Sequence, residues 1–197
     1  KKSMRRTSTR STGKPVRYQG ELFKIGWYHP SWVQSPPPVI YAGANGPQML
    51  KAAPRHADAV MVSDFVPDHV RRSRAIIDAS LHEAGRDPAG FPMSNFWAWH
   101  VKESREEAER EARTWLTVRG TLYPPYIGHV LDPDEAAIVN RNIRAFFHAY
   151  NRKSDVIEGV PPEIVQKLVD RCTSASPLAE MDREIERLRE FARAGLT

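Results

Sequence analysis

The sequence has little cysteine: Cys172 is the single one among 197 residues. One cysteine cannot form an intramolecular disulfide, and it cannot build a cysteine-rich zinc centre. This scarcity favours a reducing compartment, which predicts a cytoplasmic protein. Cys172 also has no evident base partner, so we predict an inert thiol. The seven histidines show no spacing typical of metal ligands, and we therefore predict no metal site.

Long apolar runs are missing as well. No stretch approaches the roughly 18 apolar residues that a membrane span needs, and no signal peptide is visible. We therefore predict no membrane partner. The first ten residues, KKSMRRTSTR, lack acidic side chains and carry five basic ones. Because they lack interleaved aromatic residues and a DNA-binding motif, we predict no nucleic-acid partner and a flexible basic segment over residues 1–14.

Residues 15–197 alternate between apolar runs and segments with helical periodicity, which predicts one α/β domain with parallel strands. Buried strands are expected at PVIYA, DAVMVS and FPMSNFWAWHV, which are residues 38–42, 58–63 and 91–101. Helices are expected at 47–55, from a cap at Asp64 or Asp68 to Gly85, from Ser104 to 118, around 135–150, and from Ser176–Pro177 to Gly195. A short hairpin is expected within residues 13–25.

A turn of small residues lies between the first expected strand and its helix: Ala42, Gly43, Ala44, Asn45 and Gly46. In parallel α/β folds, ligands bind beyond the carboxyl ends of the strands, where this turn lies. Missing side chains and the free N–H groups of a helix start would let a phosphate or an aromatic ring approach the backbone. A tight turn that packs a helix on a sheet explains the same pattern, and no glycine-rich phosphate motif is present. Both interpretations stay open.

Other candidate residues end the neighbouring strands. Ser63 can donate a hydrogen bond to a phosphate, and Asp64 can cap its helix or accept from a ligand hydroxyl. His100 ends the third strand, where we favour a structural role over a catalytic one. Trp97 and Trp99 are interpreted as packing residues. The bulky stretch 123–127 can fold over a pocket as a lid or pack against a partner chain, and the sequence does not decide between these.

The stretch PPPVIYAGANGPQMLKAAPRHADAVMVS resembles the bacterial-luciferase-like oxidoreductases that use flavin or deazaflavin. The resemblance is strongest to the branch related to methylenetetrahydromethanopterin reductase. The features in common, in order, are Gly46–Pro47, Met49–Leu50, Ala52–Ala53 and Ala57–Asp58. Looser similarity extends it over about residues 13–197. One departure is Ala175–Ser176–Pro177, where relatives often have a Gly-Thr-Pro helix start.

The resemblance implies a fold, a cofactor and a site. The fold is the C-terminal half of a TIM-type (β/α)8 barrel, with strands five to seven and the helix before strand eight. The cofactor is coenzyme F420 or FMN, used for hydride transfer or monooxygenation of a small organic substrate. The turn matching 42–46 lines the cofactor, and the strand end matching Ser63 and Asp64 helps to hold its phosphate. The resemblance places the catalytic residues largely in the half that is missing here, so none is assigned.

A second hypothesis makes the chain a non-catalytic, truncated half-barrel that serves only as a binding or assembly module. The sequence starts with Lys1 and stops just after an expected helix, so we expect a part of a longer protein. Half a barrel leaves two unpaired strand edges. We therefore expect the isolated chain to be poorly stable or to form a homo-oligomer that covers those edges.

Overall fold

The computed structural model describes residues 14–32 and 38–197. The basic segment expected at 1–14 thus lies outside the described residues, except for Lys14. None of the helices in these two ranges is long and apolar enough to cross a membrane.

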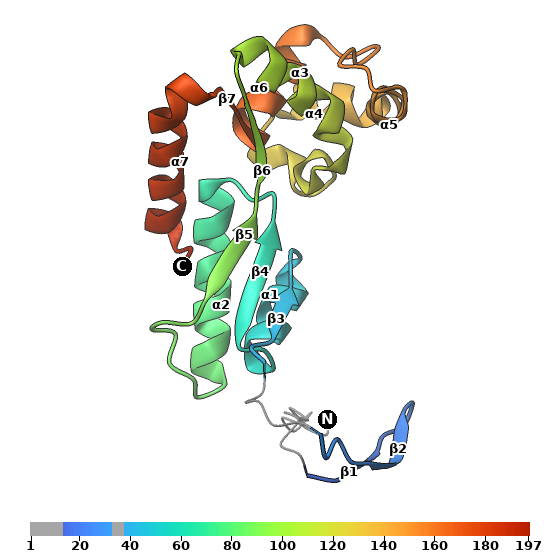
Figure 1. Ribbon diagram of the computed structural model, residues 1–197, viewed down its shortest axis with the longest axis vertical. Helices are drawn as coiled ribbons and strands as arrows, with labels where there is room; N and C mark the ends of the chain where they lie inside the picture. The colour runs from blue at the N-terminus through green and yellow to red at the C-terminus, as the bar shows by residue number, and fades with distance from the viewer. Residues whose placement is uncertain (1–13, 33–37) are drawn as a thin grey trace.

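Parallel strands form the centre of the fold (Figure 1). Strands β3 (Tyr41–Gly43), β4 (Ala59–Ser63) and β5 (Met93–Phe96) pair in that order, all parallel. After Trp97 the chain continues as β6 (Ala98–Lys102), which pairs in parallel with β7 (Thr173–Pro177). The strands predicted at 58–63 and 91–101 are confirmed, and the second of them is interrupted at Trp97. The strand predicted at 38–42 is present as the shorter β3, but the prediction that it is buried is wrong: Tyr41 is 53% exposed because β3 is the outer strand of the sheet. The described strands do not close into a barrel.

Helices follow the strands as predicted, with two corrections. Their bounds are α1 (Pro47–Ala52), α2 (Pro67–Glu83), α3 (Arg105–Trp115), α4 (Pro133–Arg141), α5 (Ile143–Arg152), α6 (Pro162–Cys172) and α7 (Met181–Ala194). The helix expected around 135–150 is two helices that meet at Asn142, whose side chain donates to the carbonyls of Ile138 and Gly159. The last helix begins at Met181 rather than at Ser176–Pro177, because residues 173–177 are extended and pair with β6.

The sequence predicted the end of α2 correctly but not its start. The helix follows Val66 and starts at Pro67, so the prediction that Asp64 or Asp68 caps it is wrong. At the other end, Gly85 has a φ of +67° and stops the helix as predicted. The expected hairpin is confirmed as β1 (Val16–Gln19) and β2 (Lys24–Tyr28), which pair antiparallel.

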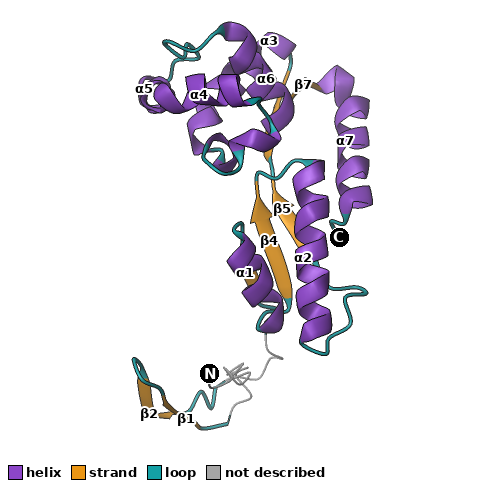
Figure 2. Cartoon of the chain, turned by 180° about the vertical axis from the view of Figure 1, so that it is seen from behind, coloured by secondary structure: helices purple, strands orange, loops and turns teal. Residues whose placement is uncertain are grey.

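Buried apolar side chains form two clusters. In the first, α1 and α2 cover one face of the β3–β4–β5 sheet (Figure 2), and Val60, Val62 and Met93 are fully buried beneath them. The second lies among α3–α6. Trp97 packs against both clusters, and its indole N–H donates to Ser174 Oγ at 2.9 Å. The packing role predicted for Trp97 is confirmed, whereas Trp99 is 40% exposed.

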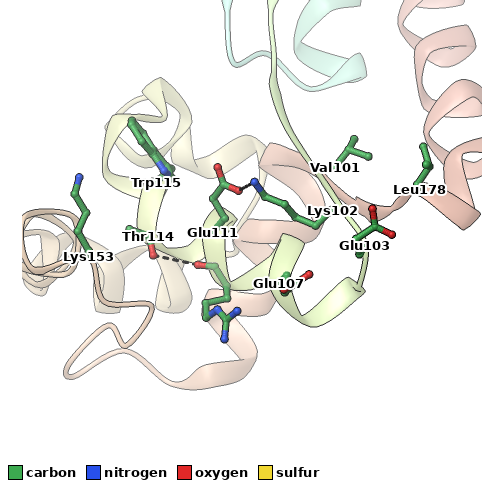
Figure 3. A pocket seen from close by; sticks show the side chains of 10 residues that line it. Val101, Lys102, Glu103, Glu107, Glu111, Thr114, Trp115, Lys153 and Leu178 are labelled. Atoms are coloured by element: carbon green, nitrogen blue, oxygen red, sulfur yellow. Dashed lines mark hydrogen bonds and ion pairs between the residues drawn. The ribbon is translucent and has the colours of Figure 1, made fainter.

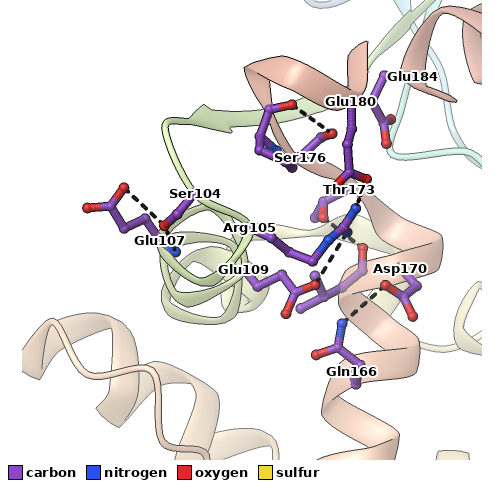
Figure 4. A network of polar contacts seen from close by, with 12 residues as sticks. Ser104, Arg105, Glu107, Glu109, Gln166, Asp170, Thr173, Ser176, Glu180 and Glu184 are labelled. Atoms are coloured by element: carbon purple, nitrogen blue, oxygen red, sulfur yellow. Dashed lines mark hydrogen bonds and ion pairs between the residues drawn. The ribbon is translucent and has the colours of Figure 1, made fainter. Parts of the chain in front are cut away.

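Charged side chains join α3 to the segment around β7 (Figure 4). Ser104 caps α3 by accepting from the Glu107 N–H at 3.2 Å, as the sequence predicts. Arg105 contacts Glu180 and lies 3.7 Å from Glu109. These ion pairs are partly exposed, so they orient the helix more than they stabilise it.

Leu50 and Met49 are neighbours in α1 on different faces of the helix. Replacing each of them tests which face packs against the sheet. Leu50 is 2% exposed and Met49 is 50% exposed. We expect Leu50→Ala to lower the free energy of unfolding by about 2–5 kcal/mol, because it leaves a cavity under the helix. Met49→Ala should change it by about 0.5 kcal/mol or less. Urea denaturation measures both, and equal losses would contradict this packing.

Candidate functional site

The turn 42–46 is fastened to the end of β4. The Ala44 N–H donates to the Met61 carbonyl at 3.0 Å. The Asn45 side chain exchanges two hydrogen bonds with the Ser63 backbone: Asn45 Oδ1 accepts from its N–H at 3.0 Å, and Asn45 Nδ2 donates to its carbonyl at 3.3 Å. The structure therefore brings the two predicted parts of the site together: the turn 42–46 and the strand end at Ser63 lie side by side, at the carboxyl ends of β3 and β4.

The two glycines of this turn lie in different surroundings. A Cβ on Gly43 would meet no atom within 4 Å, and Gly43 is exposed. A Cβ on Gly46 would lie 3.8 Å from the phenol oxygen of Tyr126. The chain's own segment thus approaches the turn at Gly46, whereas the backbone at Gly43 is open. A contact of 3.8 Å is an ordinary van der Waals distance, so packing requires a glycine at neither position, and the backbone at Gly43 is the more open of the two.

Asp64 is buried and serves the fold itself. Its carboxylate accepts from Arg119 Nη1 and the Gly120 N–H, both at 2.9 Å. Its own backbone is left-handed, with a φ of +61°, and its carbonyl accepts from the Thr121 hydroxyl. With these partners, Asp64 joins the end of β4 to residues 119–121 and has little capacity left for a ligand hydroxyl.

Ser63 is half-buried and its hydroxyl is engaged. Its Oγ lies 3.1 Å from Asp64 Oδ2, to which it donates. A serine hydroxyl has one proton, so in this arrangement Ser63 can accept from a ligand but not donate to it. The phosphate-donor role expected for Ser63 stays a prediction that needs this hydrogen bond to open.

A stack of aromatic rings holds the segment 123–129 against the start of α2. His69 stacks on Phe65 with ring centroids 3.5 Å apart and on His129 at 4.1 Å. Tyr126 adjoins the stack, 5.4 Å from His69. The structure shows segment 123–127 packed within its own chain, beside the 42–46 turn, and the two roles left open for it, as a lid or against a partner chain, stay predictions.

The side chains of His100 and Cys172 are both buried in the protein. His100 Nδ1 lies 3.7 Å from Glu111 Oε1, beyond hydrogen-bond distance. Burial lowers the pKa of His100, which keeps the ring neutral near pH 7. Burial raises the pKa of the Cys172 thiol to about 12, as expected for an inert side chain. Across 14–32 and 38–197, no three potential metal ligands come together.

A cavity of about 670 Å³ lies apart from the turn, beyond the carboxyl end of β6 (Figure 3). Lys102 and Glu111 form an ion pair at its wall, and Trp115 and Lys153 lie on another side. No residue of 42–46 lines it. The predicted site therefore lies at the carboxyl ends of β3 and β4, where Gly43 is exposed, and is not part of this cavity.

Sequence reasoning missed Arg119, Gly120 and Thr121. They lie 55 to 57 residues beyond Asp64, and no motif marks them. Only the folded chain shows that they hold the end of β4.

Replacing Asp64 tests its buried ion pair. Asp64→Asn keeps a residue that tolerates the left-handed backbone but leaves Arg119 without its counter-charge. We expect a loss of about 3–5 kcal/mol in the free energy of unfolding. Asp68→Asn, which breaks an exposed pair with Arg71, should cost about 1 kcal/mol or less. Denaturant unfolding compares the two, and similar losses would contradict the role of Asp64.

His69 makes stability depend on pH. Burial, followed by the nearby His129 and Arg72, lowers the pKa of His69 to about 4. Unfolded histidine titrates near 6.5, so protonation favours unfolding, and the stability due to neutral His69 is lost as pH falls from 6.5 toward 4. The melting temperature of the wild type should therefore fall over this pH range. His69→Phe should show a smaller fall, whereas substitution of an exposed histidine, His82→Phe, should leave the fall unchanged. An unchanged pH profile in His69→Phe would contradict the assignment.

Comparisons with known proteins place the chain in a family and a fold. A 5,10-methylenetetrahydromethanopterin reductase of Archaeoglobus fulgidus is 29% identical over 188 residues, 94% of this chain and 54% of that protein. The structure matches the coenzyme F420-dependent tetrahydromethanopterin reductase of Methanopyrus kandleri with a TM-score of 0.68 and 21% identity, over 94% of this chain and 51% of that one.

A second solved structure has the same fold. It is an F420-dependent secondary alcohol dehydrogenase in complex with an F420–acetone adduct, with a TM-score of 0.61 and 21% identity, over 95% of this chain and 49% of that one. The chain spans about half the length of these relatives. The sequence model of the luciferase-like monooxygenases matches residues 2–197. The chain therefore belongs to the luciferase-like monooxygenase family.

Proposed function

We propose that this chain binds the deazaflavin coenzyme F420 at the edge formed by residues 42–46 and Ser63, as the cofactor-binding part of an F420-dependent oxidoreductase. The observation that carries the proposal is the open backbone of Gly43, at the carboxyl end of a parallel strand, where ligands of α/β folds bind. Its substrate class is a small organic molecule with an electrophilic carbon.

Relatives support F420 in preference to FMN. Two matched structures are named as F420-dependent enzymes, and one of them was solved with an F420 adduct. The curated relative from Archaeoglobus fulgidus is also named as a reductase. We therefore propose hydride transfer rather than monooxygenation, with FMN as the alternative cofactor.

Some of the predicted site residues are suited to binding a flat ring system, and others are already engaged within the protein. Gly43 leaves room for close approach, and Ser63 offers an acceptor oxygen. Asn45 and Asp64 are engaged in holding the turn and the strand end, so we assign them a positioning role. These contacts fix the backbone before a ligand arrives, which reduces the ordering cost of binding.

Bound in its reduced form, the cofactor supplies a hydride to an electrophilic carbon. The chain's own residues bind and orient it: the Gly43 backbone sets how closely a ring can lie, and the pair of Asn45 and Ser63 fixes the turn. Tyr126 of segment 123–129 lies beside the turn at Gly46. We assign no catalytic residue to this chain and propose that such residues lie outside the 197 residues.

A fluorescence titration with F420 tests the proposal. We expect saturable binding, weakened about tenfold or more by Gly43→Val, because a branched side chain would occupy the open face. Gly26→Val is the matched control. A Cβ on Gly26 would also meet no atom within 4 Å, but Gly26 belongs to β2 and not to the 42–46 turn. A parallel titration with FMN should give weaker binding.

Circular dichroism establishes that both valine variants are folded. Binding that Gly43→Val leaves intact would place the cofactor elsewhere. No saturable binding of F420 by the folded wild-type chain would contradict the proposal.

A further inference from the structure

The polar side chains predicted for the cofactor site are already held by the protein. The Asn45 amide is fixed by two hydrogen bonds to the backbone of Ser63. The Ser63 hydroxyl, the expected phosphate donor, gives its one proton to Asp64. The Asp64 carboxylate accepts from Arg119 and Gly120. None of these groups can turn toward a ligand without breaking a contact of the fold, whereas a phosphate offers strong acceptor oxygens that call for donors.

The hydroxyl of Tyr126 reaches the same turn from another segment. A Cβ on Gly46 would lie 3.8 Å from this phenol oxygen, which is ordinary contact distance. Within residues 14–32 and 38–197, the Tyr126 hydroxyl makes no hydrogen bond. A tyrosine hydroxyl can donate as well as accept, and it usually has a partner when its ring is packed. The proton of Tyr126 is therefore available beside the turn.

The ring of Tyr126 is anchored, so its hydroxyl is presented at a fixed place. The ring packs against the buried cluster between the sheet and the helices α1 and α2. Its centroid lies 5.4 Å from that of His69 and 5.9 Å from that of Phe65. None of these contacts involves the exposed face or the edges of the sheet. A donor that is placed before the ligand arrives reduces the ordering cost of binding.

The two ends of the turn differ in the room that they leave for a ligand. At Gly43 the backbone is open, which suits the flat ring system. At Gly46 the turn and Tyr126 face each other at contact distance, so a small group fits beside them and a ring system does not fit between them. We propose, on the basis of the proposed function, that Tyr126 donates a hydrogen bond to the phosphate of the bound cofactor at this end of the turn.

A fluorescence titration with two ligands tests the proposal. One ligand is F420, and the other is the same deazaflavin ring on a side chain that lacks the phosphate and the groups beyond it. Tyr126→Phe removes only the hydroxyl. We expect this variant to bind F420 about five- to tenfold more weakly, because a hydrogen bond to a charged acceptor is lost. Its affinity for the phosphate-free ligand should change by about twofold or less.

Tyr123→Phe is the matched control from the same segment. The Tyr123 hydroxyl donates to the Thr117 carbonyl at 3.2 Å, so its proton is already used within the chain. This variant should bind both ligands like the wild type. Circular dichroism and urea denaturation establish that both phenylalanine variants are folded.

The comparison of the two ligands separates a phosphate contact from a structural role. Equal weakening of both ligands by Tyr126→Phe would overturn the proposal, because the hydroxyl would then support the turn and not the phosphate. F420 binding that Tyr126→Phe leaves unchanged would also overturn it, while the proposed function would stand. A folded wild type that binds neither ligand would contradict the proposed function itself, and the role of Tyr126 with it.

Discussion

The buried ion pair between Asp64 and Arg119 is the contact on which the rest of the site depends. It lies where β4 ends, and its partners come from a segment 55 residues further along the chain. Both side chains are under one-tenth exposed, so neither can exchange its partner for water. A charge pair at this depth costs much to separate, and it therefore keeps residues 119–121 at the strand end.

From this contact the chain continues over the small-residue turn. Tyr126 reaches the turn at Gly46, and the stack of Phe65, His69 and His129 holds that segment against α2. One side of the turn is closed by the protein, while the side at Gly43 stays open. Ala44 is buried in the packing of the helices on the sheet, whereas Gly43 is open, and for this reason the sequence pattern alone allowed two interpretations.

Local signals predicted the local structure well. The apolar runs at 38–42 and 58–63 predicted the strands that the structure has at 41–43 and 59–63, and the cap at Ser104 and the stop at Gly85 depend on neighbouring residues. Strand β7 was missed because TSASP has neither apolar alternation nor length, and it is extended only through its pairing with β6. The partner of Asp64 was missed for the same reason: it is distant in sequence.

The likeness to F420-dependent enzymes covers about half of each relative, and in the described chain the sheet remains open. Gly43 ends β3 and pairs with Met61 of β4, so the open backbone of the turn adjoins the exposed face of the sheet.

Hydrogen–deuterium exchange with and without F420 tests the central claim most directly. The account predicts that the coenzyme slows exchange in peptides that cover residues 42–46 and the end of β4, while the segment at 119–121 is already protected before it binds. Protection confined to other regions, or rapid exchange at 119–121 in the free chain, would contradict it.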